Sequence, residues 1–95
     1  MTFIIVFEDN PGASPDIRKT YMSQHLAFLE RHADQISAAG PLSDPDAKGR
    51  DGLWILNVDT AQDAERLVHE DPFWPTGLRK SYAIIAWKQV FAAGR

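Results

Sequence analysis

The apolar residues of this chain change their spacing several times, and each change marks a switch between strand and helix. The chain opens with a short β-branched and aromatic run, TFIIVFE, which ends at the turn-forming residues DNPGASP. Apolar residues then recur at helical spacing from Ile17 to Ile36, until Gly40 and Pro41 interrupt the pattern. Two further strand-like runs, LWILNV and SYAIIAWKQVF, flank a second helical segment, AQDAERLVHE. These switches predict an α+β fold.

The order of the segments narrows the fold class further. Ser14 and Thr60 are the expected N-caps of the two helices, with Pro15 at the first helical position. The order strand, helix, strand, strand, helix, strand is that of a ferredoxin-like βαββαβ domain, with an antiparallel sheet and both helices on one face. We expect this single domain to cover residues 1–95. The expected strands are 2–7, 40–43, 53–58 and 81–91, and the expected helices run from Pro15 to the Gly40–Pro41 break and over 61–70.

Both faces of the expected strands are apolar, which bears on assembly. In the first strand, Phe3, Ile5 and Phe7 point one way, while Ile4 and Val6 point the other. Two helices cover one face of a sheet, and an antiparallel sheet with its second face in water normally carries polar residues there. We therefore expect a second copy of the chain to cover this face in a two-fold homodimer, with a higher oligomer as a further option. A monomer with an exposed apolar face is the alternative.

Composition and charge exclude several classes of partner and cofactor. The net charge is −3 with scattered Lys and Arg, so the chain has no basic patch for nucleic acid or for a membrane surface. No apolar run approaches membrane length. The chain contains no cysteine, its histidines lack acidic partners at i+4, and it has no phosphate-binding glycine loop. We expect a soluble, cytoplasmic protein that binds a small molecule and uses no metal or organic cofactor.

The histidines are the first side chains to consider for acid–base chemistry near neutral pH. On a helical wheel, His25 lies beside Tyr21 in the middle of the apolar face of the first helix, and Arg18 has nearly the same bearing. A histidine among apolar neighbours is either a core residue or a pocket residue that faces a ligand, and the pattern leaves both open. His32 shares this face, and we expect His69 to be solvated.

The segment HEDPFWPTGL is too rich in special residues for a plain connector. Asp71 and Pro72 are typical of the N-cap and first-turn proline of a short helical turn, which Gly77 would close. Phe73 and Trp74 are either core residues at the end of the sheet or one wall of an apolar cavity. An acid here and a histidine on a buried helix face also fit a His–Asp pair. In such a pair the carboxylate bonds one ring nitrogen, fixes the tautomer and makes the other nitrogen a general base.

Several motifs together point to a known family. HLAFLERH, AAGPL, GRDGLWILNV, EDPFWPTGL and YAIIAWKQVF follow one another over nearly the whole chain, and their order and spacing resemble the YciI-like family, also called the YCII-related domain. The resemblance implies a dimeric α+β barrel of two ferredoxin-like sheets, with a His–Asp dyad in a pocket of each subunit. Carried over by position, the dyad is His25 and Asp71. Better-understood relatives include a dehydrochlorinase that acts on a chlorinated hydroxyquinol, and muconolactone isomerase shares the barrel.

The chain departs from the family pattern at one position. Many members have an arginine three residues before the histidine, where this chain has Met22. If that arginine holds an anionic group of the substrate, this protein either lacks the contact or supplies it from Arg18. Ser43, just after Gly–Pro–Leu, is either a hydroxyl at the pocket or the initiating residue of the turn at Asp44–Pro45.

The function we expect is that of a small cofactor-independent lyase or isomerase, similar to the dehydrochlorinase or to muconolactone isomerase. A non-catalytic binding or regulatory dimer that uses the same pocket is the alternative. A purely structural dimer is the third possibility, and it predicts a separated histidine and aspartate without a cavity. The expected site residues are His25 and Asp71 as the acid–base pair, with Arg18, Tyr21, Ser43, Phe73 and Trp74 around a small cyclic or enolisable substrate.

Overall fold

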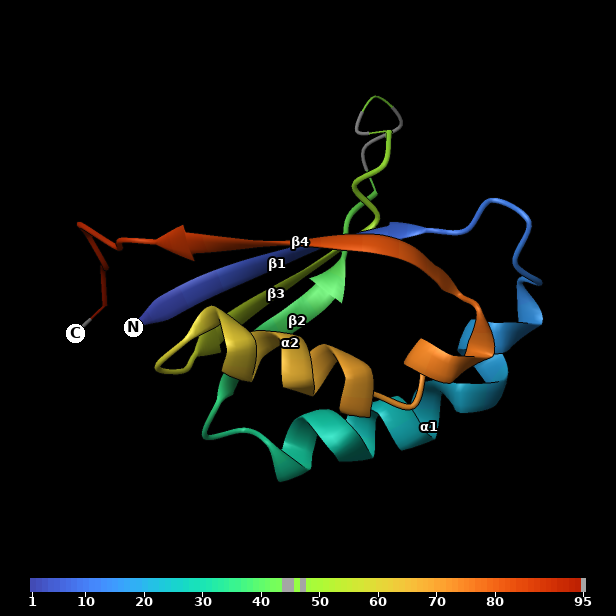
Figure 1. The fold of residues 1–95 in the computed structure, drawn as a ribbon, viewed down its shortest axis with the longest axis horizontal. Coiled ribbons are helices and arrows are strands. Elements are labelled where there is room, and N and C mark those ends of the chain that lie inside the picture. Colours follow the sequence, from blue (N-terminus) through green and yellow to red (C-terminus); the bar gives the residue numbers. More distant parts are fainter. Residues whose placement is uncertain (44–45, 47, 95) are drawn as a thin grey trace.

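The computed structural model describes residues 1–43, 46 and 48–94. In this part of the chain, four strands and two α-helices follow one another in the expected βαββαβ order, with a short 3₁₀ helix, η1, before the last strand (Figure 1). Neither described helix is long and apolar enough to cross a membrane. The elements are β1 (Thr2–Asp9), α1 (Asp16–Arg31), β2 (Ile36–Pro41), β3 (Gly52–Asn57), α2 (Ala61–Glu70), η1 (Trp74–Thr76) and β4 (Arg79–Trp87).

The strands form one antiparallel sheet in the order β2-β3-β1-β4. Both helices lie on the same face of this sheet (Figure 1). The register places Ile5 of β1 opposite Trp54 of β3 and Ile84 of β4, so these three side chains point toward the helices. The architecture is therefore the ferredoxin-like α+β fold that the order of the segments predicted.

The core lies between the sheet and the two helices. Phe7 of β1 packs edge to face against Trp54 of β3, with ring centroids 5.0 Å apart. Phe28 of α1 and Leu67 of α2 are almost fully buried from the opposite side. Alternate residues of β1 and β3 are buried, which confirms the assignment of side chains to the two faces of the sheet. The cluster consists of Phe3, Ile5, Phe7, Phe28, Ile36, Trp54, Leu56, Val58, Ala64, Leu67 and Val68.

The other face of the sheet is also apolar, and we call it the outer face. Ile4 of β1 lies between Ile55 of β3 and Ile85 of β4. Ile85 and Trp87 are 47% and 41% exposed, values that are high for large apolar side chains on a sheet. The outer face consists of Ile4, Val6, Leu53, Ile55, Ala83, Ile85 and Trp87.

The first helix is shorter than the sequence pattern predicts. It ends at Arg31, and Ile36 already belongs to β2, where it pairs with Leu56. The strand expected at 40–43 therefore begins earlier. Ile36 continues the helical spacing in sequence, but its N–H is bonded to the carbonyl of His32 in a turn and its neighbours pair with β3. Tertiary pairing overrides the local pattern here.

The helix caps agree with the sequence at α2 and differ at α1. Thr60 Oγ1 accepts a hydrogen bond from the Asp63 N–H at 3.1 Å, as a capping threonine should. At α1 the residue in the N-cap position is Pro15, while Ser14 Oγ accepts from the Asp16 N–H at 3.2 Å. Ser14 therefore bonds the first turn from one residue further out than predicted.

The last two strands lie slightly closer to the N-terminus than the sequence predicts. β3 covers Gly52–Asn57, against an expected 53–58. β4 covers Arg79–Trp87, against an expected 81–91. Both shifts are small, but the second places Arg79 within the sheet, beside Asp9 of β1.

Candidate active site

His25 and Asp71 meet inside the molecule although they are 46 residues apart in sequence. The His25 side chain comes from α1, and Asp71 is the C-cap of α2. His25 Nδ1 lies 2.7 Å from Asp71 Oδ1, and the two side chains are 9% and 3% exposed. The predicted contact between them is confirmed, and the chemical role of the pair stays a prediction.

The local structure around Asp71 holds its carboxylate in place. Asp71 Oδ1 also accepts a hydrogen bond from the Phe73 N–H at 3.3 Å, and the Asp71 carbonyl accepts from the Trp74 N–H at 2.9 Å. Gly77 ends η1 with φ of +83°, a left-handed conformation that glycine adopts without steric cost. The N-cap of η1 is Phe73, so the prediction that Asp71 is the N-cap of the short helical turn is wrong. The Asp71 carboxylate instead bonds both the Phe73 N–H and His25.

Aromatic rings fix the orientation of the His25 imidazole. The centroid of the Phe73 ring lies 4.4 Å from that of His25, and the centroid of Trp54 lies 6.3 Å away. A carboxylate can only accept, so Nδ1 is the donor in the bond to Asp71. Since Nδ1 carries the proton, Nε2 of the neutral ring has the free lone pair. The ring also lines a pocket.

The pocket has a volume of about 110 Å³. An apolar cavity of about 150 Å³ can hold a benzene molecule, so this pocket has the scale of part of one small ring. Leu26, one of the lining residues, is 55% exposed. Besides His25, the walls come mainly from Met22, Leu26 and Leu29 of α1, Gly40 and Pro41 of β2, and Trp54 of β3.

Two arginines also line the pocket, and they share one carboxylate. Arg18 Nη2 donates to Asp9 Oδ2 at 2.6 Å, and Arg79 Nη1 donates to Asp9 Oδ1 at 2.8 Å. The Arg79 side chain is 5% exposed, and its guanidinium carbon lies 4.3 Å from the centroid of the Phe7 ring. Burial lowers the pKa of Arg79 from its ordinary value, while the hydrogen bond and charge of Asp9 oppose that change. An arginine remains charged under these conditions.

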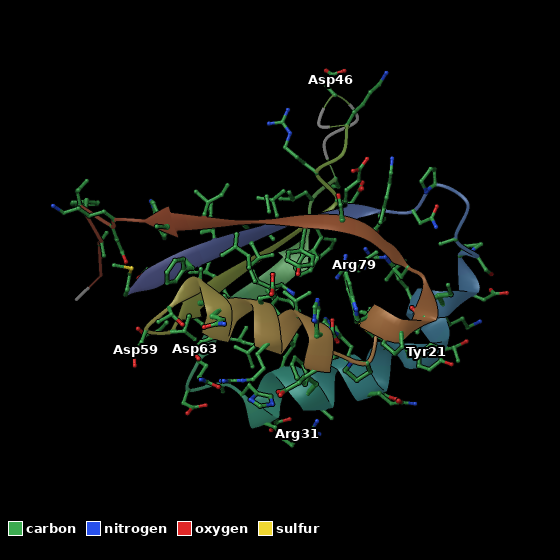
Figure 2. All side chains as sticks on the ribbon, viewed as in Figure 1. Tyr21, Arg31, Asp46, Asp59, Asp63 and Arg79 are labelled. Atoms are coloured by element: carbon green, nitrogen blue, oxygen red, sulfur yellow. The ribbon has the colours of Figure 1, made fainter. Side chains whose placement is uncertain are left out.

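Some of the expected pocket residues lie elsewhere. Trp74 stacks on His69, with centroids 4.9 Å apart, because η1 turns its side chain toward the end of α2. Ser43 is exposed, and Tyr21 lies half-buried near the start of α1 (Figure 2). Phe73 is fully buried behind the His25 ring. The prediction that Tyr21, Phe73 and Trp74 wall the cavity is therefore wrong, and the walls come from α1, β2, β3 and Arg79.

Arg79 is the main pocket residue that the sequence analysis missed. Its side chain extends from the start of β4 into the space between the sheet and the helices (Figure 2). The expected topology could have predicted that Arg79 lies beside Asp9. Asp9 ends β1, Arg79 begins β4, and these strands are antiparallel neighbours, so the two opposite charges meet at one end of the sheet.

The other histidines do not extend the site. His69 is exposed, as expected, and its Nε2 lies 3.1 Å from the Tyr82 hydroxyl. His32 is half-buried against the ring of Phe28, with centroids 4.7 Å apart. Within the part of the chain that the structure describes, no three His, Cys, Asp or Glu side chains are grouped so that they could hold a metal ion.

Comparison with known proteins identifies a family and one similar enzyme. The sequence profile of the YCII-related domain matches residues 1–88. No curated protein matches the chain in sequence. Among solved structures, the chain is similar to 5-chloro-2-hydroxyhydroquinone dehydrochlorinase (TftG) from Burkholderia phenoliruptrix AC1100, in complex with 2,5-dihydroxybenzoquinone. The two are 28% identical over 93% of this chain and 94% of that one, with a TM-score of 0.75.

More distant structures share the fold. Protein Atu4242 from Agrobacterium tumefaciens is 18% identical over 98% of each chain, with a TM-score of 0.60. A dimeric protein of unknown function with a ferredoxin-like fold, from Bacteroides fragilis NCTC 9343, is 13% identical over 88% of this chain and 90% of that one, with a TM-score of 0.52. The profile match covers most of the chain, and this protein therefore belongs to the YCII-related domain family.

Proposed function

We propose that this protein is a cofactor-independent lyase or isomerase in which His25 acts as the general base and Asp71 orients it. The observation that carries this proposal is the 2.7 Å contact between His25 Nδ1 and Asp71 Oδ1 beside a pocket of about 110 Å³. The 28% identity to the dehydrochlorinase TftG supports the same class of chemistry.

The buried carboxylate gives the histidine two properties that a general base needs. It holds the Nδ1 proton, so the Nε2 lone pair is available to the substrate. It also stabilises the imidazolium that forms when Nε2 takes up a proton, and this effect is stronger where water is largely excluded. The two side chains are 9% and 3% exposed, which meets that condition.

The reaction would begin when Nε2 removes a proton from an acidic carbon or hydroxyl of a small cyclic or enolisable substrate. The electron pair of the broken bond then moves into the substrate. In an elimination, a leaving group such as chloride departs with its bonding pair, and the imidazolium later returns its proton to water. In an isomerisation, the imidazolium delivers the proton to another carbon. The relationship to a dehydrochlorinase favours elimination.

The test is turnover of 5-chloro-2-hydroxyhydroquinone and of muconolactones by the wild type and by His25→Gln. A positioned acid–base group contributes about 10²–10⁴ in rate, so His25→Gln should lower turnover by that factor without loss of fold. His32→Gln, on the same helix but against Phe28, is the matched control and should retain the wild-type rate. If a ligand binds but no reaction rate depends on His25 or Asp71, the protein is a small-molecule-binding module and not an enzyme.

We also propose that two copies assemble through the outer face. Its apolar residues include Ile85 and Trp87, which are 47% and 41% exposed in the single chain. A ferredoxin-like protein of similar fold from Bacteroides fragilis is described as dimeric. Two-fold symmetric dimers, in which the same patch of both subunits is buried, are the commonest homo-oligomers.

Sedimentation equilibrium at micromolar concentration tests the assembly and should give twice the chain mass. Ile4→Lys places a charge at the centre of the outer face and should dissociate or unfold the protein. Gln62→Lys, at an exposed position of α2, is the control and should leave the dimer intact. A stable monomer of the wild type would contradict the proposed assembly.

A further inference from the structure

Arg79 is a pocket residue with much of its hydrogen-bonding capacity unused. Its side chain is 5% exposed, and Nη1 donates to Asp9 Oδ1 at 2.8 Å. Its Nε is buried and has no hydrogen-bond partner among the described residues. A buried donor without a partner is costly, and native structures rarely contain one without a reason. The same side chain lines the pocket next to His25, so a ligand that reached the buried Nε from there would supply the acceptor.

The free nitrogens of Arg79 have a specific geometry. A guanidinium is planar and presents its N–H groups as forks. Nη1 is bonded to Asp9, and the fork on the other side of the guanidinium is the one formed by Nε and Nη2. Such a fork matches two acceptor oxygens that lie side by side in one plane, as in a carboxylate. A single isolated oxygen would use only half of it.

The side chains at the Arg79 end of the pocket carry a net positive charge, while the Asp71 carboxylate lies behind His25. Asp9 serves both Arg18 and Arg79, so this trio of side chains keeps a net positive charge. Gly52 helps to make room for the arrangement, because a Cβ at this position would lie 3.2 Å from Arg79 Nη1. Phe7 and Phe73 lie on the guanidinium, with ring centroids 4.3 Å and 5.7 Å from its central carbon. Arg79 is thus packed in one position before any ligand binds.

We infer that Arg79, assisted by Arg18 and positioned by Asp9, is an anion clamp that holds a planar oxyanion with two adjacent oxygens. This inference rests on the proposed function, and it names the class of substrate: a small ring or enolate that presents either a carboxylate or vicinal oxygens beside the bond that His25 attacks. The clamp would also stabilise the negative charge that develops on those oxygens as the proton leaves. Arg18 and Arg79 then supply the positive charge that many family members have in an arginine at the position of Met22.

Binding of three small probes to the wild type tests the clamp without any need for turnover. The probes are 2,5-dihydroxybenzoquinone, whose hydroxyls stand beside its carbonyls, benzoate, which carries a carboxylate, and phenol, which has a single oxygen and is neutral at pH 7. By titration calorimetry, one or both of the first two should bind at least about tenfold more tightly than phenol. The tighter of the two identifies which arrangement of oxygens the fork prefers. Equal affinity for all three would overturn the inference.

Arg79→Lys keeps the positive charge but removes the fork of N–H groups. It therefore tests whether the fork, and not the charge alone, binds two adjacent oxygens. It should weaken binding of the two-oxygen probes by about tenfold or more and leave phenol unchanged. Arg66→Lys, at an exposed position of α2, is the matched control and should bind all probes as the wild type does. Wild-type affinity of Arg79→Lys for the two-oxygen probes would overturn the inference.

Two further measurements separate the possible failures. If Arg79→Lys does not fold, Arg18→Met carries the test, because Arg18 is 34% exposed and its loss removes one of the two cations. Arg18→Met should also bind the two-oxygen probes more weakly than the wild type does. Unchanged affinity for these probes would overturn the inference. By contrast, a rate that does not depend on His25 would refute the proposed chemistry and leave the clamp as an anion-binding site.

Discussion

His25 and His69 each have a hydrogen-bond partner and an aromatic neighbour, but they differ in burial. His25 bonds Asp71 at 2.7 Å and lies against Phe73, with ring centroids 4.4 Å apart. His69 lies 3.1 Å from the Tyr82 hydroxyl and stacks on a tryptophan at 4.9 Å. His25 is buried beside a pocket, whereas His69 is exposed. A hydrogen bond and an aromatic neighbour are therefore common to both, and burial next to a carboxylate and a cavity distinguishes His25.

The comparison suggests why one histidine is a candidate base and the other is a surface contact. The partner of His25 is an acid that is 3% exposed, so its charge acts through a medium of low polarity. The partner of His69 is a hydroxyl, which in turn donates to Glu65 Oε2 at 3.1 Å on the surface. Water screens such exposed interactions, and they contribute little.

The largest expected difference is in turnover, between removal of the Asp71 carboxylate and removal of the Glu65 carboxylate. Asp71→Asn should lower turnover by about 10² or more, because an amide can donate to Nδ1 and force the proton onto Nε2. We call His69, Trp74, Tyr82 and Glu65 the surface cluster. Glu65→Gln, in this cluster, should change turnover by less than about twofold. Steady-state rates with a substrate of the wild type measure both. Equal effects of the two substitutions would remove the distinction between the clusters.

The aromatic neighbours should differ in their contribution to stability. Phe73 is fully buried, so Phe73→Ala should lower the free energy of unfolding by about 3–5 kcal/mol. Trp74 is half-buried, and Trp74→Ala should cost about 1–3 kcal/mol. Urea denaturation followed by circular dichroism gives both values. A larger loss for Trp74 than for Phe73 would show that the surface cluster, and not the dyad, anchors this part of the chain.

The smallest expected effect is a pH dependence that belongs to Tyr82. Burial raises the pKa of Tyr82 above its ordinary value of 10.0, and the bond to Glu65 and its charge add to the rise. The unfolded chain therefore loses the tyrosine proton first as pH increases. The stability that comes from this difference is complete below pH 10 and is lost as pH rises through the folded-state pKa.

Denaturation curves of the wild type and of Tyr82→Phe between pH 8 and pH 11 measure this effect. The wild type should lose a little more stability than the variant above about pH 10. Parallel curves over the whole range would mean that the surface cluster does not hold the hydroxyl as described.

Much of the fold could be predicted from the sequence because it rests on local signals, and the pairing of His25 with Asp71 was implied by the family resemblance. The βαββαβ order followed from the changes in apolar spacing, and Thr60 caps α2 as its sequence context indicates. His25 lay on the apolar face of its helix, and Asp71 preceded a proline in a capping context. Their meeting depends on α1 and α2 sharing one face of the sheet, which the topology already required.

The rest depends on tertiary contacts that a linear pattern does not contain. α1 ends at Arg31 because Ile36 pairs with β3, although its spacing continues the helix. Trp74 was expected at the cavity, but η1 directs it toward His69. Arg79 was missed because its burial follows from Asp9 on a neighbouring strand, 70 residues away in sequence.

The most direct test of the account is the protonation state of the two nitrogens of His25 in the wild-type protein. ¹⁵N NMR of the histidine-labelled protein distinguishes a protonated ring nitrogen from one with a free lone pair. We expect that neutral His25 carries its proton on Nδ1, toward Asp71, and has the lone pair on Nε2. A neutral His25 with its proton on Nε2 would contradict the account, because the ring would then have no base to offer to the pocket.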